Sequence, residues 1–211
     1  VIQYEGNNKM TTARGEQVIT KGYASGFEEL IQYINNVLPV REVMGEALRK
    51  DVPVYPILSV REAIANAIIH QDLTMRGTGI MIEIFSDRME VSNPGAPLID
   101  IDRFLDHPPI SRNEMMAAFM RRIGICEERG SGFDKIIAEV ESYQLPAPEI
   151  EVFDSHTKVT LFAYRTFADI SKEERIWACY MHTCLKHVKR EYATNATLRE
   201  RFKIEKKNSS M

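Results

Sequence analysis

The sequence of 211 residues has no apolar run that approaches the roughly 18 residues of a membrane-spanning helix. Its opening, Val1-Ile2-Gln3-Tyr4-Glu5-Gly6, carries neither a basic stretch nor a long apolar stretch, so it does not look like a signal peptide. Three cysteines are too few, and odd in number, for a disulfide framework, which favours a reducing compartment. We therefore expect a cytoplasmic protein that does not enter a membrane.

The chain also lacks an initiator methionine, internal repeats and low-complexity segments. Because its opening reads like the middle of a strand, we expect it to be a piece of a longer protein. It contains no Walker A motif and no helicase motif, which argues against a P-loop nucleotide site. With 44% hydrophobic and 27% charged residues, the composition is that of a globular protein, with length for one full domain and part of a second.

The formal net charge of −3 hides an uneven distribution of charge. Residues 171–211 hold ten Lys and Arg against five Asp and Glu, whereas the preceding 170 residues hold 17 basic and 25 acidic side chains. An acidic body with a basic tail suggests that the tail contacts an anionic partner, and DNA is the first candidate. A solvated, Lys-rich helix is the alternative, and charge alone does not separate the two.

Apolar periodicity predicts strands, mostly paired in hairpins, mixed with helices. The predicted strands lie at 79–85, 88–92, 149–153 and 157–164. The predicted helices lie at 25–38, 59–72, 111–123, 133–143, 171–188 and 195–202, with Ser25 and Ser59 as caps of the first two. This mixture predicts an α+β fold, a two-layer α/β sandwich, over residues 1–168, followed by a partial helical domain over 169–211.

The predicted helix at 59–72 carries a polar stripe. Glu62, Asn66 and His70 are spaced at i, i+4 and i+8, so they line one side of the helix. In one interpretation Glu62 only completes a capping box with Ser59, and the other two side chains face water. In the other, Asn66 binds Mg²⁺ and Glu62 orients a water molecule, because a hard cation on phosphates prefers oxygen ligands.

Two further features favour the second interpretation. The Gly130-Ser131-Gly132 turn precedes a predicted helix, and a glycine turn at a helix N-terminus presents N–H groups and a positive dipole end to phosphate. Asn93-Pro94-Gly95 breaks the predicted hairpin, and the long connection that follows it has the length of a lid.

The order of these features resembles the Bergerat-type (GHKL) ATP-binding fold of DNA gyrase, the ninety-kilodalton heat-shock chaperones, sensor histidine kinases and MutL proteins. More closely, residues 1–164 resemble the bacterial transcriptional-regulator-like proteins labelled after the C-terminal part of RecG helicase. In those proteins an AlbA-type domain, shared with schlafen proteins, precedes the module, and a winged helix often follows. The motifs that carry the resemblance are Arg61-Glu62-Ala63-x-x-Asn66-Ala67-x-x-His70-x-Asp72, Phe85-Ser86-Asp87-Arg88-Met89-Glu90-Val91-Ser92-Asn93-Pro94-Gly95, Ser111-Arg112-Asn113 and Glu128-Arg129-Gly130-Ser131-Gly132.

The resemblance implies a role for each matching residue. Glu62 matches the catalytic acid of the superfamily, and Asn66 matches its Mg²⁺-binding asparagine. Asn93 and Gly95 lie where the superfamily has an aspartate that hydrogen-bonds the adenine amino group, followed by glycine. An asparagine oxygen can accept the same bond, but it lacks the charge of the carboxylate.

The remaining matches concern the phosphates. Gly130, Ser131 and Gly132 match a shortened phosphate-binding turn, and Arg112 in the connection is a phosphate partner by its charge. The implied ligands are ATP or ADP with Mg²⁺.

The tail resembles the start of a winged helix-turn-helix, with its first two helices in place. A recognition helix is expected to begin near Asn208-Ser209-Ser210, where the sequence ends. Cys179, His182 and Cys184 in the first tail helix could ligate zinc, but Cys184 lies on a different helix face, which favours a plain helix.

The favoured function is that of a transcriptional-regulator fragment, in which an ATP-binding-like domain acts as a nucleotide-responsive switch beside a DNA-binding domain. Catalysis is at most a slow, Mg²⁺-dependent hydrolysis of ATP. The alternative is a non-enzymatic interaction or dimerisation scaffold that has lost nucleotide binding, and homo-oligomers fit either interpretation.

Overall fold

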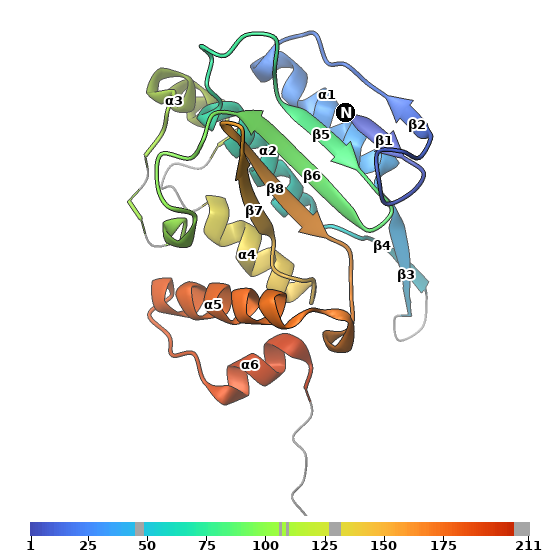
Figure 1. Ribbon diagram of the computed structural model, residues 1–211, viewed down its shortest axis with the longest axis vertical. Coiled ribbons are helices and arrows are strands. Elements are labelled where there is room, and N and C mark those ends of the chain that lie inside the picture. Colours follow the sequence, from blue (N-terminus) through green and yellow to red (C-terminus); the bar gives the residue numbers. More distant parts are fainter. Residues whose placement is uncertain (45–48, 106, 109, 127–131, 205–211) are drawn as a thin grey trace, which may run out of the picture.

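The computed structural model describes residues 1–44, 49–105, 107–108, 110–126 and 132–204. A six-stranded sheet lies at its centre (Figure 1), with the strand order β2-β1-β5-β6-β8-β7. β1 and β5 pair in parallel, and all other neighbours in this sheet are antiparallel. The strands are β1 (Ile2–Tyr4), β2 (Ala13–Glu16), β5 (Met81–Ile84), β6 (Arg88–Pro94), β7 (Glu149–Phe153) and β8 (His156–Phe162), and β3 (Val40–Met44) and β4 (Arg49–Pro53) form a separate hairpin.

The helices form the second layer, so the predicted α+β fold class is confirmed. α1 (Tyr23–Val37), α2 (Ile57–His70) and α4 (Gly132–Ser142) lie behind the sheet in Figure 1, and α2 packs against both α4 and β6. α3 (Glu114–Arg122) contacts α2, and α5 (Lys172–Val188) packs against α4, with α6 (Asn195–Phe202) beyond it.

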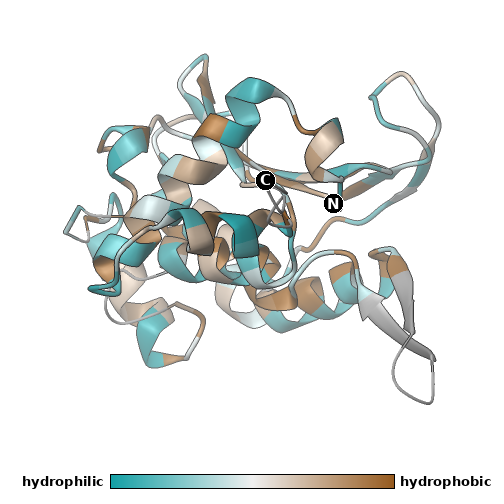
Figure 2. Ribbon diagram, turned by 90° about the horizontal axis from the view of Figure 1, so that it is seen from below, coloured by the Kyte–Doolittle hydropathy of each residue, from teal (hydrophilic) through white to brown (hydrophobic). Residues whose placement is uncertain are grey.

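The hydrophobic core lies between α2 and the sheet. Ile64 and Ile68 of α2 are buried, as are Met89 and Val91, which alternate along β6 with more polar residues. This alternation is what a strand with one apolar face requires. Figure 2 shows hydrophobic and hydrophilic residues interspersed around the helices, as expected for helices that bury one side.

The opposite face of the sheet carries charged side chains. Glu83 and Glu90 lie directly opposite each other on β5 and β6, and both are buried. Each carboxylate has a cation at 2.6 Å, Lys9 for Glu83 and Arg88 for Glu90. The hydroxyl of Tyr4 also donates to Glu83. These partners offset the repulsion between two like charges in adjacent strands.

Three predicted helix starts are wrong, at Ser25, Ser59 and Ser111; of these, the helix predicted from Ser111 begins only at Glu114, after Asn113. The first helix begins at Tyr23 after Gly22, which has a φ of 80° and makes no side-chain cap, rather than at Ser25. α2 begins at Ile57 after Pro56, so Ser59 lies inside the helix. Its hydroxyl donates to the carbonyl of Ile136 in α4 instead of capping α2. Ser59 therefore joins α2 to α4 and does not cap α2.

The two helices of the tail begin and end as predicted. Ser171 and Thr194 each form a capping box with the third residue of the following helix. His182 is buried, and both its ring nitrogens lie within hydrogen-bond distance of protein oxygens, at Glu141 of α4 and Thr197 of α6. Because both His182 nitrogens already have protein partners, the plain helix is favoured over a zinc site. The described residues contain no cluster of three His, Cys, Asp or Glu side chains suited to a metal ion. The expected recognition helix at 208–210 lies outside the described residues.

Candidate functional site

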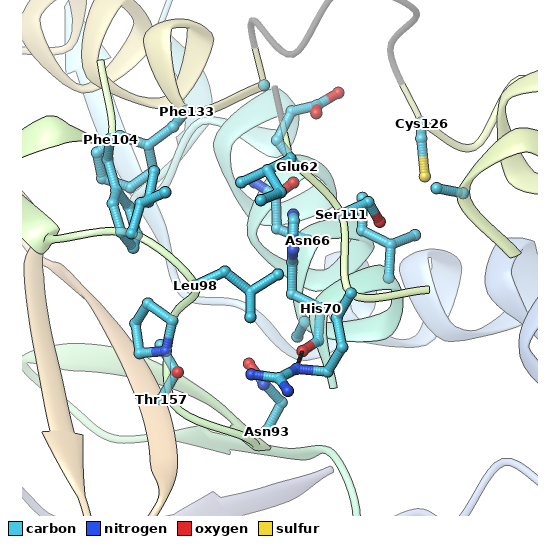
Figure 3. Close-up of a pocket in the computed structure, with 18 of the residues that line it drawn as sticks. Glu62, Asn66, His70, Asn93, Leu98, Phe104, Ser111, Cys126, Phe133 and Thr157 are labelled. Carbon is cyan, nitrogen blue, oxygen red and sulfur yellow. Dashed lines mark hydrogen bonds between the residues drawn. The ribbon is translucent and has the colours of Figure 1, made fainter. Parts of the chain in front are cut away.

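A cavity of about 590 Å³ opens between α2, α4, the ends of β6 and β8, and the connection from β6 to α3. Its volume falls within the range of roughly 300–1,000 Å³ typical of ligand pockets. We call residues 96–112 the covering segment, because its described residues form one wall. The lining includes Glu62, Asn66, His70, Val91, Asn93, Leu98, Phe104, Arg112, Cys126, Gly132, Phe133 and Thr157 (Figure 3).

The polar stripe predicted on α2 faces this cavity. Glu62 is only 3% exposed and Ser59 lies inside α2, so the interpretation of Glu62 as part of a capping box with Ser59 is wrong. A Cβ atom placed on Gly132 would lie 2.8 Å from Glu62 Oε2 and 3.5 Å from Asn66 Nδ2. The first turn of α4 therefore meets both side chains. The positive end of a helix dipole stabilises an acidic group at this distance.

Close packing of α2 on α4 produces this arrangement. The Ser59 hydroxyl donates to the carbonyl of Ile136, and Gly132 leaves the space that the Glu62 carboxylate fills. The Arg61 guanidinium donates to the carbonyls of Gly124 and Ile125, which ties α2 to the backbone directly after α3. Arg61 has no site role in the sequence interpretation, although it belongs to the same motif as Glu62.

The other end of the cavity lies where β6 meets β8. Asn93 Nδ2 donates to the carbonyl of Pro94 at 3.0 Å, so its Oδ1 remains an acceptor on the other side of the amide. Gly95 has a φ of 104°, a conformation that favours glycine, and its carbonyl accepts from the Thr157 hydroxyl at 2.6 Å. Thr157 lines the cavity but was missed in the sequence, because a single threonine in a strand gives no signal.

Arg112 and Asn113 bind the C-terminal end of α2. Arg112 Nε donates to the carbonyl of His70 at 3.2 Å, and its Nη2 donates to the carbonyl of Ala96 at 2.6 Å. Asn113 Nδ2 donates to the carbonyls of Ile69 and Gln71. Because the last carbonyls of a helix have no partner inside the helix, these bonds satisfy them and hold the covering segment in place. Arg112 also lines the cavity. Its contact with phosphate stays a prediction.

Electrostatic effects keep two groups of the cavity uncharged at neutral pH. Burial, and next the Arg112 charge, lowers the pKa of His70 below its ordinary value. Burial, together with the Glu62 carboxylate, raises the pKa of the Cys126 thiol to about 11. The cavity is thus acidic at Glu62, whereas its other end holds the uncharged His70 and Asn93 beside the Arg112 guanidinium.

The structure brings most of the predicted site residues together. Glu62, Asn66, Asn93, Arg112 and Gly132 all line the one cavity, and Gly95 lies directly beside its wall. Gly130 and Ser131 lie outside the described residues. Convergence of residues from α2, β6, α4 and the covering segment is the geometric requirement of a shared ligand site.

Comparison with known proteins points to an ATPase-like domain. Residues 77–161 match a family described as "Putative ATP-dependent DNA helicase recG C-terminal". The chain is similar to this family over about two fifths of its length. The matched stretch contains Asn93, Gly95 and Gly132, but it begins after Glu62 and Asn66 and does not include them. No curated protein sequence matches the chain.

A solved structure shares the fold. The crystal structure of the DIP2311 protein from Corynebacterium diphtheriae superposes with a TM-score of 0.71 at 22% identity. The match covers 96% of this chain and 46% of the other, so this chain spans just under half of that protein. Across the described residues, the helices are all too short or too polar to cross a membrane.

Proposed function

We propose that the chain binds an adenine nucleotide, ATP or ADP, together with Mg²⁺, in the cavity between α2, α4, β6 and β8. One observation carries the proposal: oxygen-bearing side chains from separate segments meet in a cavity of nucleotide size, at the first turn of a helix. The family match over residues 77–161 supports the same ligand class.

The phosphates belong at the α4 end of the cavity. Gly132 begins α4, and the N–H groups and positive dipole end of a helix start attract phosphate. Asn66 Oδ1 and the Glu62 carboxylate are the hard oxygen donors that Mg²⁺ prefers, so these residues fit the metal. The bound metal would neutralise phosphate charge, and Glu62 would hold and orient a water molecule beside the terminal phosphate.

The base belongs at the opposite end. Asn93 Oδ1 can accept a hydrogen bond from an exocyclic amine, because Asn93 Nδ2 is already engaged with Pro94. Val91 and Leu98 give this region apolar walls, and Asn93 and Thr157 give it uncharged polar groups. A planar heterocycle suits these surroundings, because it can pack against the apolar walls and form hydrogen bonds with the uncharged polar groups.

Nucleotide titration tests the proposal. ADP and ATP, each with and without Mg²⁺, are titrated by calorimetry and by thermal unfolding. A ligand at about 100 times its Kd should add about 2.7 kcal/mol to the free energy of unfolding. Asn66→Ala should remove the Mg²⁺-dependent part of the affinity, whereas Asn35→Ala on the exposed side of α1 should change nothing. Absence of binding by the unaltered chain would refute the proposal.

For the regulatory role, we propose that the chain is part of a transcriptional regulator whose C-terminal region contacts DNA. The excess of basic residues after residue 171 supports contact with phosphate, as do exposed Lys189, Arg190 and Lys203 around α6. Phosphate contacts alone carry no base information, so DNA binding by this chain should be weak, indifferent to sequence and steeply reduced by salt. Tight, sequence-specific binding would contradict this expectation.

An exposed apolar stripe favours a second candidate, a dimerisation scaffold. Met115, Phe119 and Ile123 along α3 are 90%, 50% and 45% exposed, at a spacing that places them on one side of the helix. In an antiparallel pair of α3 helices, Glu114 of one copy would lie near Arg122 of the other, so the surface is complementary to itself. Phe119→Glu should then shift the oligomeric state toward monomer in light scattering. A monomer at all concentrations would exclude this scaffold.

A further inference from the structure

α2 presents three polar side chains to the cavity, and the third, His70, has no role in the nucleotide site as proposed above. The helix rises 1.5 Å per residue, so His70 lies about 12 Å along α2 from Glu62. The two ends of the stripe must therefore contact different parts of an extended ligand. In Figure 3 the side chains of Asn66, His70 and Asn93 follow one another along the cavity.

The end of α2 that carries His70 is fixed against the end of β6. The backbone N–H of Asp72 donates to the carbonyl of Pro94 at 2.7 Å, and a Cβ atom on Gly95 would lie 3.0 Å from the Asp72 nitrogen. Arg112 holds the His70 carbonyl from the other side. The His70 imidazole therefore belongs to the same end of the cavity as Asn93, away from α4.

The imidazole has hydrogen-bonding capacity to offer a ligand. Within the part of the chain that the structure describes, no residue forms a hydrogen bond with the His70 ring. A neutral imidazole carries one N–H donor and one acceptor nitrogen. Burial and the nearby Arg112 guanidinium lower the pKa of His70 and so favour this neutral form. The ring can therefore form a hydrogen bond with the edge of a heterocycle without bringing a charge to it.

We infer that His70 is a specificity-determining residue, which together with Asn93 recognises the base of the bound nucleotide. This inference rests on the proposed nucleotide function and adds to it the selection among bases. Asn66 and Glu62 at the α4 end recognise phosphates and metal, which all nucleotides share. His70 recognises the part that differs between nucleotides.

The test measures base preference separately from total affinity. Kd values for ADP and GDP, both with Mg²⁺, are measured by calorimetry on the unaltered chain and on His70→Ala, His70→Gln and Asn66→Ala. His187→Gln, on an exposed part of α5, is the matched control. Circular dichroism and thermal unfolding establish that each variant is folded.

The unaltered chain should prefer ADP over GDP, and His70→Ala should reduce that ratio about tenfold, as expected for one hydrogen bond to the base. His70→Gln should restore part of the preference, because its amide also offers a donor and an acceptor. Asn66→Ala should weaken both nucleotides alike and leave the ratio unchanged, and His187→Gln should leave both Kd values unchanged.

The possible failures are distinguishable. If His70→Ala and His70→Gln both keep the ADP:GDP ratio, or if His70→Ala weakens both nucleotides equally, the inference fails while the nucleotide function stands. If the unaltered chain binds neither nucleotide, the proposed function and the inference fail together. If His70→Ala does not fold, the polar variant His70→Gln decides, since a reduced ADP:GDP ratio in a folded protein supports the role and an unchanged ratio overturns it.

Discussion

The Cβ position of Gly132 lies 2.8 Å from Oε2 of Glu62, closer than any ordinary contact between a methyl group and an oxygen. The two residues come from different helices and are 70 positions apart in the sequence. The first turn of α4 therefore lies in direct contact with the Glu62 carboxylate of α2. Glycine at position 132 therefore leaves the space that the Glu62 carboxylate occupies.

Gly132→Ala should displace the Glu62 carboxylate without unfolding the protein. Glu62 Oε2 is the end of a flexible side chain, so it can move, and alanine is up to about 1 kcal/mol more favourable than glycine in a helix. We expect little change in the melting temperature but weaker Mg²⁺-dependent nucleotide binding in calorimetry. Gly79→Ala, where nothing lies near the new methyl group, is the control. Unchanged binding by Gly132→Ala would separate Glu62 from the metal site.

Glu62→Gln should separate catalysis from binding. A general base contributes roughly 10²–10⁴-fold to a rate, so any Mg²⁺-dependent ATP hydrolysis should fall by at least about a hundredfold. ADP affinity should fall only slightly, because the amide keeps one oxygen donor for Mg²⁺, the shape of the side chain and its contact with Gly132. Phosphate release and calorimetry give the two readouts, with Glu28→Gln on the exposed side of α1 as the control. Hydrolysis that survives Glu62→Gln would end the catalytic role.

Gly95→Ala should destabilise the fold because two effects add. The φ of 104° is strained for any residue with a side chain, and the new Cβ would lie 3.0 Å from the backbone nitrogen of Asp72. We expect a loss of about 1–3 kcal/mol in the free energy of unfolding, measured with urea. Gly77→Ala has a similar φ of 76° with open space around it, so it measures the backbone strain alone. Equal losses in both variants would mean that the contact with Asp72 contributes nothing.

Local periodicity predicted the α+β fold class and the polar side of α2, and the order of the motifs led to residues that line one cavity, whose role in binding stays a prediction. Local patterns also predicted three helix starts wrongly. Ser59 has the spacing of a cap, but packing of α4 against α2 uses its hydroxyl instead. Thr157 was missed because its role depends on the register that sets it beside Asn93, and register is a property of the assembled sheet.

The clamp formed by Arg112 and Asn113 was beyond sequence reasoning for a similar reason. Charge alone suggested a phosphate partner, but three of the acceptors that these side chains reach are backbone carbonyls of Ile69, His70 and Gln71. Backbone carbonyls have no sequence signature. Their identity follows only from where α2 ends and where the covering segment returns.

The start of α5 should lose stability in acid. Although burial alone would raise the pKa of Glu174, hydrogen bonds from the Ser171 backbone and from Arg165 lower it below its ordinary 4.5. Because the folded-state pKa is depressed, this stabilisation is present above about pH 4.5 and is lost as the pH falls through the folded value. Glu174→Gln should therefore destabilise the protein by about 0.5–2 kcal/mol at pH 7 and by much less near pH 3. A difference that does not change with pH would contradict this assignment.

Nucleotide binding should be visible in the fluorescence of α5. Trp177 is the only tryptophan of the chain, and its ring stacks on Tyr180 with centroids 5.6 Å apart. The Tyr180 hydroxyl donates to the carbonyl of Asp102 in the covering segment at 2.6 Å. Because that segment forms a wall of the cavity, a ligand that shifts it should move Tyr180 against Trp177 and change the emission.

Tyr180→Phe tests this connection, since it removes the hydrogen bond to Asp102 and keeps the stacked ring. We expect ADP with Mg²⁺ to change the Trp177 emission in the unaltered chain, and we expect a smaller change in Tyr180→Phe. The binding free energies of the two proteins in calorimetry should differ by no more than the contribution of one hydrogen bond, about 0.5–1.5 kcal/mol. Tyr192→Phe, whose ring is 88% exposed, should behave like the unaltered chain. Binding that is seen in calorimetry but leaves the emission unchanged would mean that the covering segment holds its position when the cavity fills. An emission change that persists in full in Tyr180→Phe would mean that α4, which also packs on α5, carries the signal instead.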